Sequence, residues 1–248
     1  MPDGANPFAY RELYGTLIAG RSTRIALALL LTPLYVGALA YMLFIEEEFG
    51  AFVALERLAF VLLIPPLLAI ALVREREETT LDMNRMTARP GAHMLLGKMM
   101  GLIRLYRPVV WAIVLGKLMV AVVATGYGFY FMWTSEARYA ECYVFRYWFD
   151  LGTLPLHVMR VLCLACAGAV FPRTALGAIV SALACSGVFL LPTLVFQMQW
   201  VRNIVIPPEA TVAYLAAFLL PISATLVPCW FAFTIAAARI TVLWEPKN

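Results

Sequence analysis

The chain has 248 residues, of which 63% are hydrophobic and only 14% charged, and its formal net charge is +4. A soluble globular domain has about half its residues apolar and about a quarter charged, so this composition excludes an ordinary soluble domain and indicates a polytopic membrane protein. The basic residues form no patch interleaved with aromatics of the kind that binds nucleic acid, and no nucleic-acid partner is expected.

The N-terminal residues 1–24 place aromatic and aliphatic side chains on one helical face, which predicts an amphipathic helix at the membrane interface. The apolar run that follows is far longer than the roughly 7 to 15 residues of a signal-peptide core, so we expect it to be retained as a span. A helix needs about 20 apolar residues to cross the hydrocarbon. We therefore expect one all-α membrane domain over 1–248 with six transmembrane helices, at 25–45, 51–73, 107–128, 154–172, 174–198 and 210–238.

Residues 74–98 form a dense block of charge between the second and third expected spans. Either Thr79 or Thr80 can cap a short helix, and Asp82 would then lie where the helix dipole favours negative charge. The sequence at 89–91, Arg-Pro-Gly, is expected to stop that helix, because proline cannot continue the hydrogen-bond ladder. We expect a short exposed helix on the membrane surface, suited to docking.

Lysine and arginine predict the orientation. If the N-terminus is cytoplasmic, thirteen basic residues fall inside and five fall outside: Arg57, Arg138, Arg146, Arg160 and Arg202. Cytoplasmic segments of membrane proteins carry an excess of basic residues, so both termini and the 74–98 loop are expected in the cytoplasm. The acidic first outer loop, Glu46-Glu47-Glu48, agrees with this orientation.

The 74–98 loop carries an ordered motif: an acidic-basic run, Thr-Leu before an acidic residue, a further threonine and a closing Leu-Gly-Lys. The residues are Glu75, Glu77, Thr80-Leu81-Asp82, Thr87 and Leu96-Gly97-Lys98. Two further segments carry recognisable features: Asn6-Pro7-Phe8 with Arg11-Glu12 near the N-terminus, and Phe171-Pro172-Arg173-Thr174-Ala175. In these features the chain resembles the permease subunits of ABC-2 type transporters, in which the last segment is the turn between spans four and five. It departs at Thr79, where the family often has glycine, and at Thr87, which Ala88-Arg89-Pro90 follow rather than proline directly.

The resemblance implies the membrane subunit of an exporter in the cytoplasmic (inner) membrane. It implies two partners, a second permease copy or homologue and a cytoplasmic ABC ATPase docked on the 74–98 loop. The residues implied in ATPase coupling are Glu75, Glu77, Thr80, Leu81, Asp82, Arg85, Met86, Gly97 and Lys98.

The chain itself lacks a phosphate-binding loop. The closest approach, from Gly91 to Met99, has five residues between its glycines instead of four, and methionine where a serine or threonine must hold magnesium. ATP and magnesium are therefore expected on the partner subunit. The chain is expected to be no enzyme and to hold no cofactor or metal.

Lys117 lies near the middle of the third expected span, where an ammonium costs at least about 2.5 to 3.5 kcal/mol on insertion scales. It either faces a polar cavity or a dimer interface and binds or steers an anionic group, or it is a structural residue in an interhelical ion pair or with a snorkelling stem. Glu56 and Asp150 are expected near the outer ends of their spans, too shallow to reach it. A wet cavity or an anionic cargo is then expected to compensate the charge.

A polar stripe precedes and enters the fourth expected span, with spacings of four, three, four and three that share one helical face. Its members are Arg146, Asp150, Thr153, His157 and Arg160. The stripe either lines an outer vestibule or re-entrant element, or belongs to an amphipathic helix at the outer interface. Asp150 and Arg160 are each expected within reach of His157, and together with Lys117 these residues form the candidate translocation path.

Two other classes of function stay open at this point. An intramembrane enzyme would use Asp150, His157 and Arg160, with the first two as acid and base, although the chain contains no HExxH or GxSxG motif. A scaffold without transport fits the composition but gives no reason for the loop motif. The five cysteines fall mostly in apolar runs, and we expect them to pack as small hydrophobes rather than bind metal.

Overall fold

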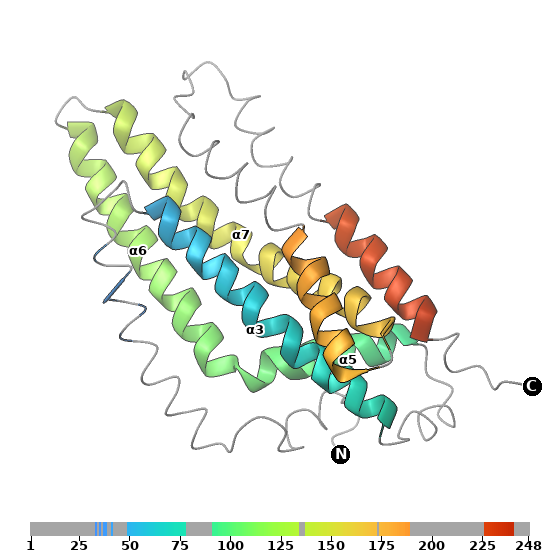
Figure 1. The fold of residues 1–248 in the computed structure, drawn as a ribbon. Helices are drawn as coiled ribbons and strands as arrows, with labels where there is room; N and C mark the ends of the chain where they lie inside the picture. Colours follow the sequence, from blue (N-terminus) through green and yellow to red (C-terminus); the bar gives the residue numbers. More distant parts are fainter. Residues whose placement is uncertain are drawn as a thin grey trace, which may run out of the picture.

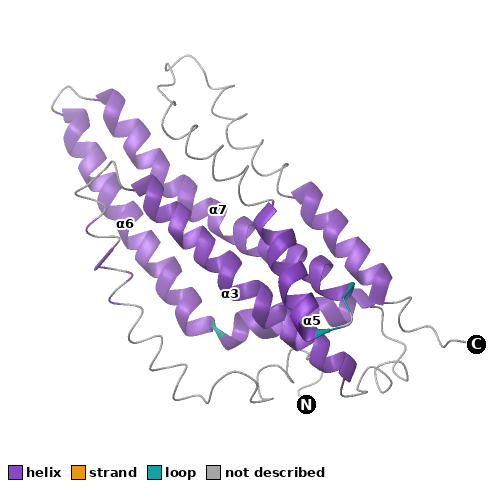
Figure 2. Ribbon diagram, in the orientation of Figure 1, coloured by secondary structure: helices purple, strands orange, loops and turns teal. Residues whose placement is uncertain are grey.

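The computed structural model describes residues 33, 35, 37, 38 and 41 and the ranges 49–77, 91–133, 137–172, 174–188 and 226–240. Over these ranges the chain is helical except at the breaks around 106 and 171–174, and the described residues contain no strand (Figure 2). The expected all-α fold is confirmed for this part of the chain.

Four helices carry labels in Figure 1: α3 (Phe49–Glu77), α5 (Gly91–Leu105), α6 (Arg107–Trp133) and α7 (Ala137–Val170). Two shorter apolar helices follow, Ala175–Val188 and Leu226–Ile240. Three stretches are long and apolar enough to cross a membrane: Phe52–Val73, Arg107–Tyr130 and Tyr147–Val170. The chain is therefore a membrane protein with at least these three candidate spans.

The second and third expected spans, 51–73 and 107–128, coincide with two of these candidate stretches, Phe52–Val73 in α3 and Arg107–Tyr130 in α6. The fourth was expected to begin at 154, which is wrong, because α7 begins at Ala137 and its apolar stretch at Tyr147. The polar stripe lowers the hydropathy of this segment, but it occupies only one face of an otherwise apolar helix.

The remaining expected spans are described only in part. Ala175–Val188 and Leu226–Ile240 overlap the fifth and sixth expected spans. The N-terminal helix expected at 1–24, and most of the first span at 25–45, lie outside the described residues.

The three long helices lie side by side, with α5 crossing the end of the bundle at which α3 finishes (Figure 1). α3 and α7 run in the same direction, since Arg57 contacts Asp150 and, further along both helices, Val61 packs with Val161. α6 runs the opposite way and forms a hairpin with α7 (Figure 1). Such alternation is what successive membrane crossings require.

α5 and α6 are separate helices because of the sequence around Tyr106. Pro108 has no N–H, so the bond that an uninterrupted helix would place on the Arg104 carbonyl is missing. Bonds from the Tyr106 N–H to Leu102 (3.2 Å) and from the Val110 N–H to Tyr106 (3.0 Å) carry the chain through the break. With 15 residues α5 is about 22 Å long, shorter than the roughly 30 Å of hydrocarbon in a bilayer.

α7 is the central helix, since 72% of its most apolar stretch is buried, against 28% for those of α3 and α6. Its last turns, from Leu162 to Val170, form the main core with α3, α5 and the two shorter helices. A smaller core lies nearer the other end, where Ala121 and Ala124 of α6 meet Tyr147. The polar stripe of α7 lies between these two apolar clusters.

The turn at 171–174 joins α7 to Ala175–Val188, as expected for the segment Phe171 to Ala175. Thr174 caps the helix Ala175–Val188, because its Oγ1 accepts a hydrogen bond from the Gly177 N–H at 3.1 Å. The two helices then approach closely at Gly168, where an added Cβ would lie 2.5 Å from the Ser181 carbonyl oxygen. Only glycine fits this crossing without a shift of the backbone.

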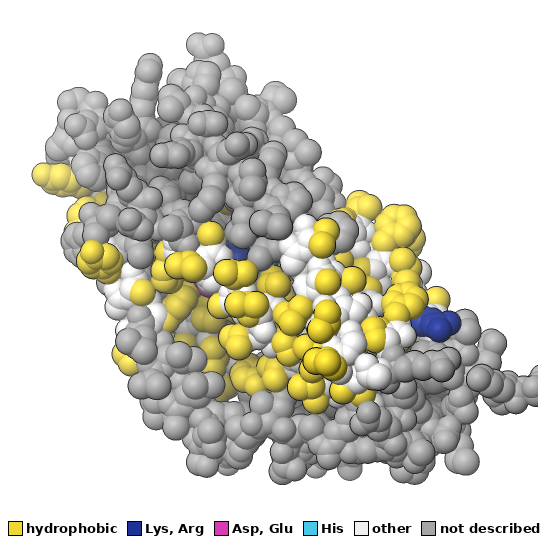
Figure 3. Space-filling model, in the orientation of Figure 1, with side chains coloured by type: hydrophobic (Ala, Val, Ile, Leu, Met, Phe, Trp, Pro, Cys, Tyr) yellow, Lys and Arg dark blue, Asp and Glu magenta, His cyan; other side chains and the backbone are white. Residues whose placement is uncertain are grey.

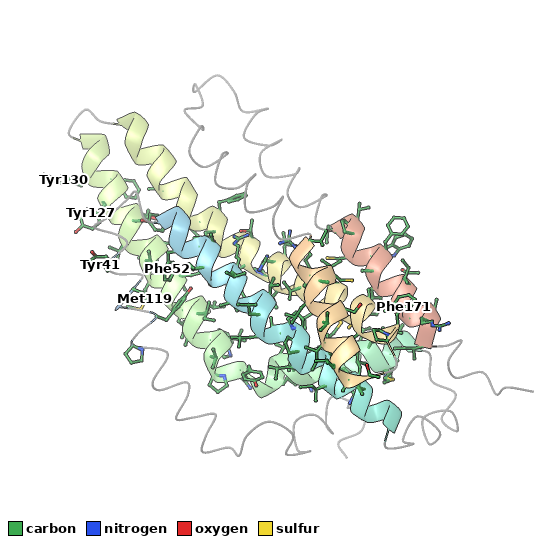
Figure 4. The ribbon with its side chains drawn as sticks, in the orientation of Figure 1. Tyr41, Phe52, Met119, Tyr127, Tyr130 and Phe171 are labelled. Atoms are coloured by element: carbon green, nitrogen blue, oxygen red, sulfur yellow. The ribbon has the colours of Figure 1, made fainter. Side chains whose placement is uncertain are left out.

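The outward faces of the bundle are apolar, as expected for helices in contact with lipid, and the visible described surface is almost entirely hydrophobic (Figure 3). Tyr41, Tyr127 and Tyr130 extend outward near one end, and Phe171 near the other (Figure 4). The Arg239 guanidinium lies 5.9 Å from the centre of the Phe171 ring. Aromatic and basic side chains at the two ends are typical of the membrane–water interfaces.

Candidate functional site

The polar stripe of α7 is buried within the bundle. Asp150, Thr153, His157 and Arg160 are each at most 6% exposed. An amphipathic helix lying on the outer interface would leave such a stripe in water, so that interpretation is wrong. Arg146 belongs to α7, but its side chain lies outside the described residues.

Four charged side chains from three helices form what we call the charge cluster: Glu56 and Arg57 of α3, Lys117 of α6 and Asp150 of α7. Lys117 Nζ lies 2.6 Å from Glu56 Oε2 and donates a hydrogen bond to Asp150 Oδ2. The Arg57 guanidinium donates to Asp150 Oδ1 at 3.1 Å. With two cations and two carboxylates the cluster is formally neutral.

Two hydroxyl groups complete the cluster. Thr153 Oγ1 accepts a hydrogen bond from Arg57 at 3.0 Å and donates to the Asp150 carbonyl oxygen at 3.2 Å. The Tyr35 hydroxyl donates to Glu56 Oε1 at 3.0 Å. Glu56 Oε2 differs from the other carboxylate oxygens, since it is in ionic contact with Lys117 but accepts no hydrogen bond from a described residue.

This pairing makes the burial of four charges tolerable. An isolated charge is very costly in a medium of low dielectric constant, and removing one member of a buried pair leaves the other uncompensated. Each cation here contacts a carboxylate from another helix, so the cluster joins α3, α6 and α7 in one register.

The expectation that Glu56 and Asp150 are too shallow to reach Lys117 is wrong, since both contact its ammonium. Lys117 lies 16 residues before Trp133 at the end of α6, and Asp150 lies 13 residues after Ala137 at the start of α7. Because α6 and α7 form an antiparallel hairpin, these positions come to a similar level. Of the two interpretations of Lys117, the interhelical ion pair is confirmed, and no cargo is needed to compensate the charge.

Further along α7, the Arg160 guanidinium contacts His157 Nδ1 at 2.9 Å. Because a guanidinium can only donate, Nδ1 is the acceptor in this contact. The His157 ring also lies 6.1 Å from the Phe60 ring of α3, centre to centre. His157 therefore meets Arg160 as expected, but the carboxylate of Asp150 is directed to Lys117 and Arg57 instead.

The described part of the 74–98 loop is helical. Glu75 and Glu77 belong to the last turn of α3, and α5 begins at Gly91. Gly97 is buried and the Lys98 side chain is only 2% exposed, and both belong to α5, so the last residues of the 74–98 segment are helical and lie inside the bundle. The apolar residues of α5 on either side of Lys98 pack into the main core and take it inside.

The other residues expected to dock the ATPase lie outside the described residues: Thr80, Leu81, Asp82, Arg85 and Met86. The short docking helix expected there stays a prediction.

The described cysteines pack as expected. Cys163, Cys166 and Cys229 are free thiols buried in the main core. Among the residues that the structure describes, no three His, Cys, Asp or Glu side chains come together as metal ligands do.

Three cluster members were missed from the sequence, namely Tyr35, Glu56 and Arg57. From the sequence, Arg57 is expected in an outer segment, and Glu56 is expected too near the outer end of its span to reach Lys117. The available signal was the Glu-Arg pair itself, which lies inside the apolar stretch Phe52–Val73, where charged groups need partners.

The fold and the cluster define a class, an α-helical membrane protein with a neutral charge network buried among its candidate spans. The chain matches no protein-family model, no curated protein and no solved structure with which it was compared.

Proposed function

We propose that the chain is the permease subunit of an ABC-2 type transporter and exports a substrate across the cytoplasmic membrane. The observation that carries this proposal is the charge cluster, because ionisable groups buried in membrane helices are costly and mark substrate or ion pathways. The ordered motif at 74–98 supports the particular class. The absence of a phosphate-binding loop from the sequence supports a separate ATPase.

In this proposal the chain crosses the membrane six times, has both termini in the cytoplasm and assembles with a second permease copy. The alternating directions of α3, α6 and α7 support successive crossings. Arg57, Arg160 and Lys98 are buried and no longer belong in the count of loop charges. Twelve basic residues inside then face three outside, which supports the orientation more strongly.

The proposal also gives α3 a role in coupling. Glu56 lies near the start of α3, and Glu75 and Glu77 lie in its last turn, about 30 Å away along a helix. Pro65 and Pro66 lie between them, and proline is a common cause of helix kinks. Movement of the docked loop would thus reach the charge cluster along one helix, in which the two prolines offer a point of bending.

The geometry favours a permease over an intramembrane enzyme. Both carboxylate oxygens of Asp150 contact cations, so this group is held as an ion-pair partner rather than poised to take a proton from His157. His157 Nδ1 is occupied by Arg160. A scaffold without transport would give no reason for the ordered motif at 74–98.

The test is purification of the chain from its native membrane in mild detergent. We expect an ABC ATPase to co-purify, and we expect Leu81→Asp, or Glu75→Lys with Glu77→Lys, to uncouple ATP hydrolysis from transport while the membrane domain stays folded. Arg138→Glu, on the opposite side of the membrane in this orientation, is the control and should leave ATPase binding unchanged. Purification without any ATPase, or normal coupling in the loop variants, would show that the proposal is wrong.

A further inference from the structure

We propose that the charge cluster binds one monovalent cation, which takes the place of the Lys117 ammonium between Glu56 and Asp150. The proposal goes beyond the permease function, because it concerns the chain alone and requires no ATPase.

The first argument is geometric. Glu56 and Asp150 come from different helices, yet each turns one carboxylate oxygen to the same ammonium group. Their other oxygens are held by different donors, Tyr35 for Glu56 and Arg57 for Asp150. The two oxygens that contact Lys117 are thus fixed by groups other than Lys117, and the site between them persists when the lysine stem withdraws.

The second argument is the charge. Without the ammonium, Glu56 and Asp150 face only the single positive charge of Arg57, which leaves one net negative charge in a buried cluster. One singly charged ion restores neutrality, whereas a divalent ion would leave a net positive charge. Among the described residues, no third His, Cys, Asp or Glu side chain joins the two carboxylates as a ligand for a divalent metal ion.

The third argument is the state of Glu56 Oε2. The Glu56 side chain is only 6% exposed, and Oε2 lies 2.6 Å from Lys117 Nζ, yet it accepts no hydrogen bond from any described residue. The ammonium is held in place by the lysine stem, and its contact with Oε2 is an ion pair without hydrogen-bond geometry. A free ion has no such constraint and satisfies this oxygen at least as well.

Exchange would have a structural consequence. Lys117 is the member of the cluster that α6 contributes, whereas Arg57 still joins α3 to α7 when the lysine withdraws. Cation binding would thus free α6 from the other two helices at this level. Such a link between an ion and a helix contact is suited to a protein that changes conformation.

The experiment measures the melting temperature of the purified full-length chain in detergent at constant ionic strength. Tetramethylammonium chloride, too large for the site, is replaced stepwise by ammonium, potassium or sodium chloride. For Lys117→Ala we expect the melting temperature to rise with the logarithm of the ion concentration, by roughly 5 to 10 °C at about 100 times Kd. The wild type should show a smaller rise, because its lysine competes with the ion.

Two variants serve as controls. Lys98→Ala removes another buried lysine, on α5, and should show no preference for small cations. Glu56→Gln removes the anionic oxygen and should abolish the rise in melting temperature that small cations cause.

If Lys117→Ala does not fold, the wild type is compared with Glu56→Gln instead. A melting temperature that rises with small cations in the wild type, and not in Glu56→Gln, supports the site. Equal melting of the wild type in small cations and tetramethylammonium overturns the proposal, even if Lys117→Ala responds, because the ion would then only fill an engineered hole.

Discussion

At the scale of single residues, the charge cluster is organised around Asp150. Its two carboxylate oxygens hold two cations from two other helices, Lys117 and Arg57. Glu56 contacts one cation, Lys117, and is supported by the Tyr35 hydroxyl. The two acids are thus unequal, and their removal should have unequal effects on stability.

We expect Asp150→Asn to lower the free energy of unfolding by about 3 to 5 kcal/mol, the usual cost of leaving a buried cation without its partner. Glu56→Gln should cost less, since Lys117 keeps its bond to Asp150. Denaturant titration of the two variants in detergent measures the difference. A larger loss for Glu56→Gln than for Asp150→Asn would contradict this ranking.

The sequence was sufficient to single out Lys117, because a lysine within a long apolar run demands compensation. Its partners were not predictable in the same way. The depth of Asp150 in the membrane was inferred from the expected start of the fourth span at 154. Its contact with Lys117 depends instead on the register of the α6–α7 hairpin. That register follows from packing between helices and is not encoded in any single apolar run.

At the scale of elements, the tightest constraint is the crossing between α7 and Ala175–Val188. The Ser181 carbonyl oxygen and the backbone of Ala182 approach Gly168 closely enough to exclude a side chain. Close approach at small residues is a usual way for membrane helices to associate. Gly152, on the same helix α7, has nothing within 4 Å of the position of its missing Cβ.

We expect Gly168→Ala to destabilise the chain by about 1 to 3 kcal/mol, because the helices must separate to admit the methyl group. Gly152→Ala is the matched control and should be neutral or stabilising by up to about 1 kcal/mol, through its better helix propensity. Thermal melting of both variants compares them. If Gly168→Ala melts like Gly152→Ala, the close crossing is wrong.

The cap of the following helix allows a second test. Thr174→Ala removes the acceptor of the Gly177 N–H and should cost about 1 kcal/mol. Thr234→Ala is the control, because the Thr234 hydroxyl is exposed and bonds only back to the Trp230 carbonyl of its own helix. Melting temperatures that fall equally in both variants would argue against a capping role for Thr174.

Elements were predictable where the apolar signal was uniform, as in α3 and α6. The beginning of the apolar stretch of α7 at Tyr147 was missed because the buried residues that follow include Asp150 and Thr153, and a hydropathy argument assumes that buried residues are apolar. The expected loop ends at Lys98, whereas α5 begins at Gly91 and Lys98 is buried. In each case a charge was buried by tertiary contacts that local sequence does not reveal.

At the scale of the whole molecule, two regions hold the bundle together. The main core joins α7 to α3, α5 and the shorter helices, and the charge cluster joins α3, α6 and α7 nearer the other end. An apolar core is non-directional, whereas an ion-pair network breaks and re-forms as discrete contacts. The cluster is therefore the part of the molecule best suited to rearrange during transport.

A topology measurement tests this arrangement across the membrane. If α7 crosses the bilayer, residues before and after it lie on opposite sides. An impermeant thiol reagent applied to intact cells should label Ser135→Cys, and should label Ala175→Cys only after permeabilisation, with the unaltered chain as the background control. Equal labelling of both sites in intact cells would contradict the orientation.

The charge cluster supports both proposals, and the ion pair between Glu56 and Lys117 is the contact by which it joins α3 to α6. A double-mutant cycle in unfolding free energy, with Glu56→Gln, Lys117→Met and the combined variant, tests it most directly. Each single change leaves an unbalanced buried charge, whereas the double change leaves Asp150 paired with Arg57 in a neutral cluster. We therefore predict that the combined variant is more stable than either single variant, and losses that simply add would contradict the buried pair.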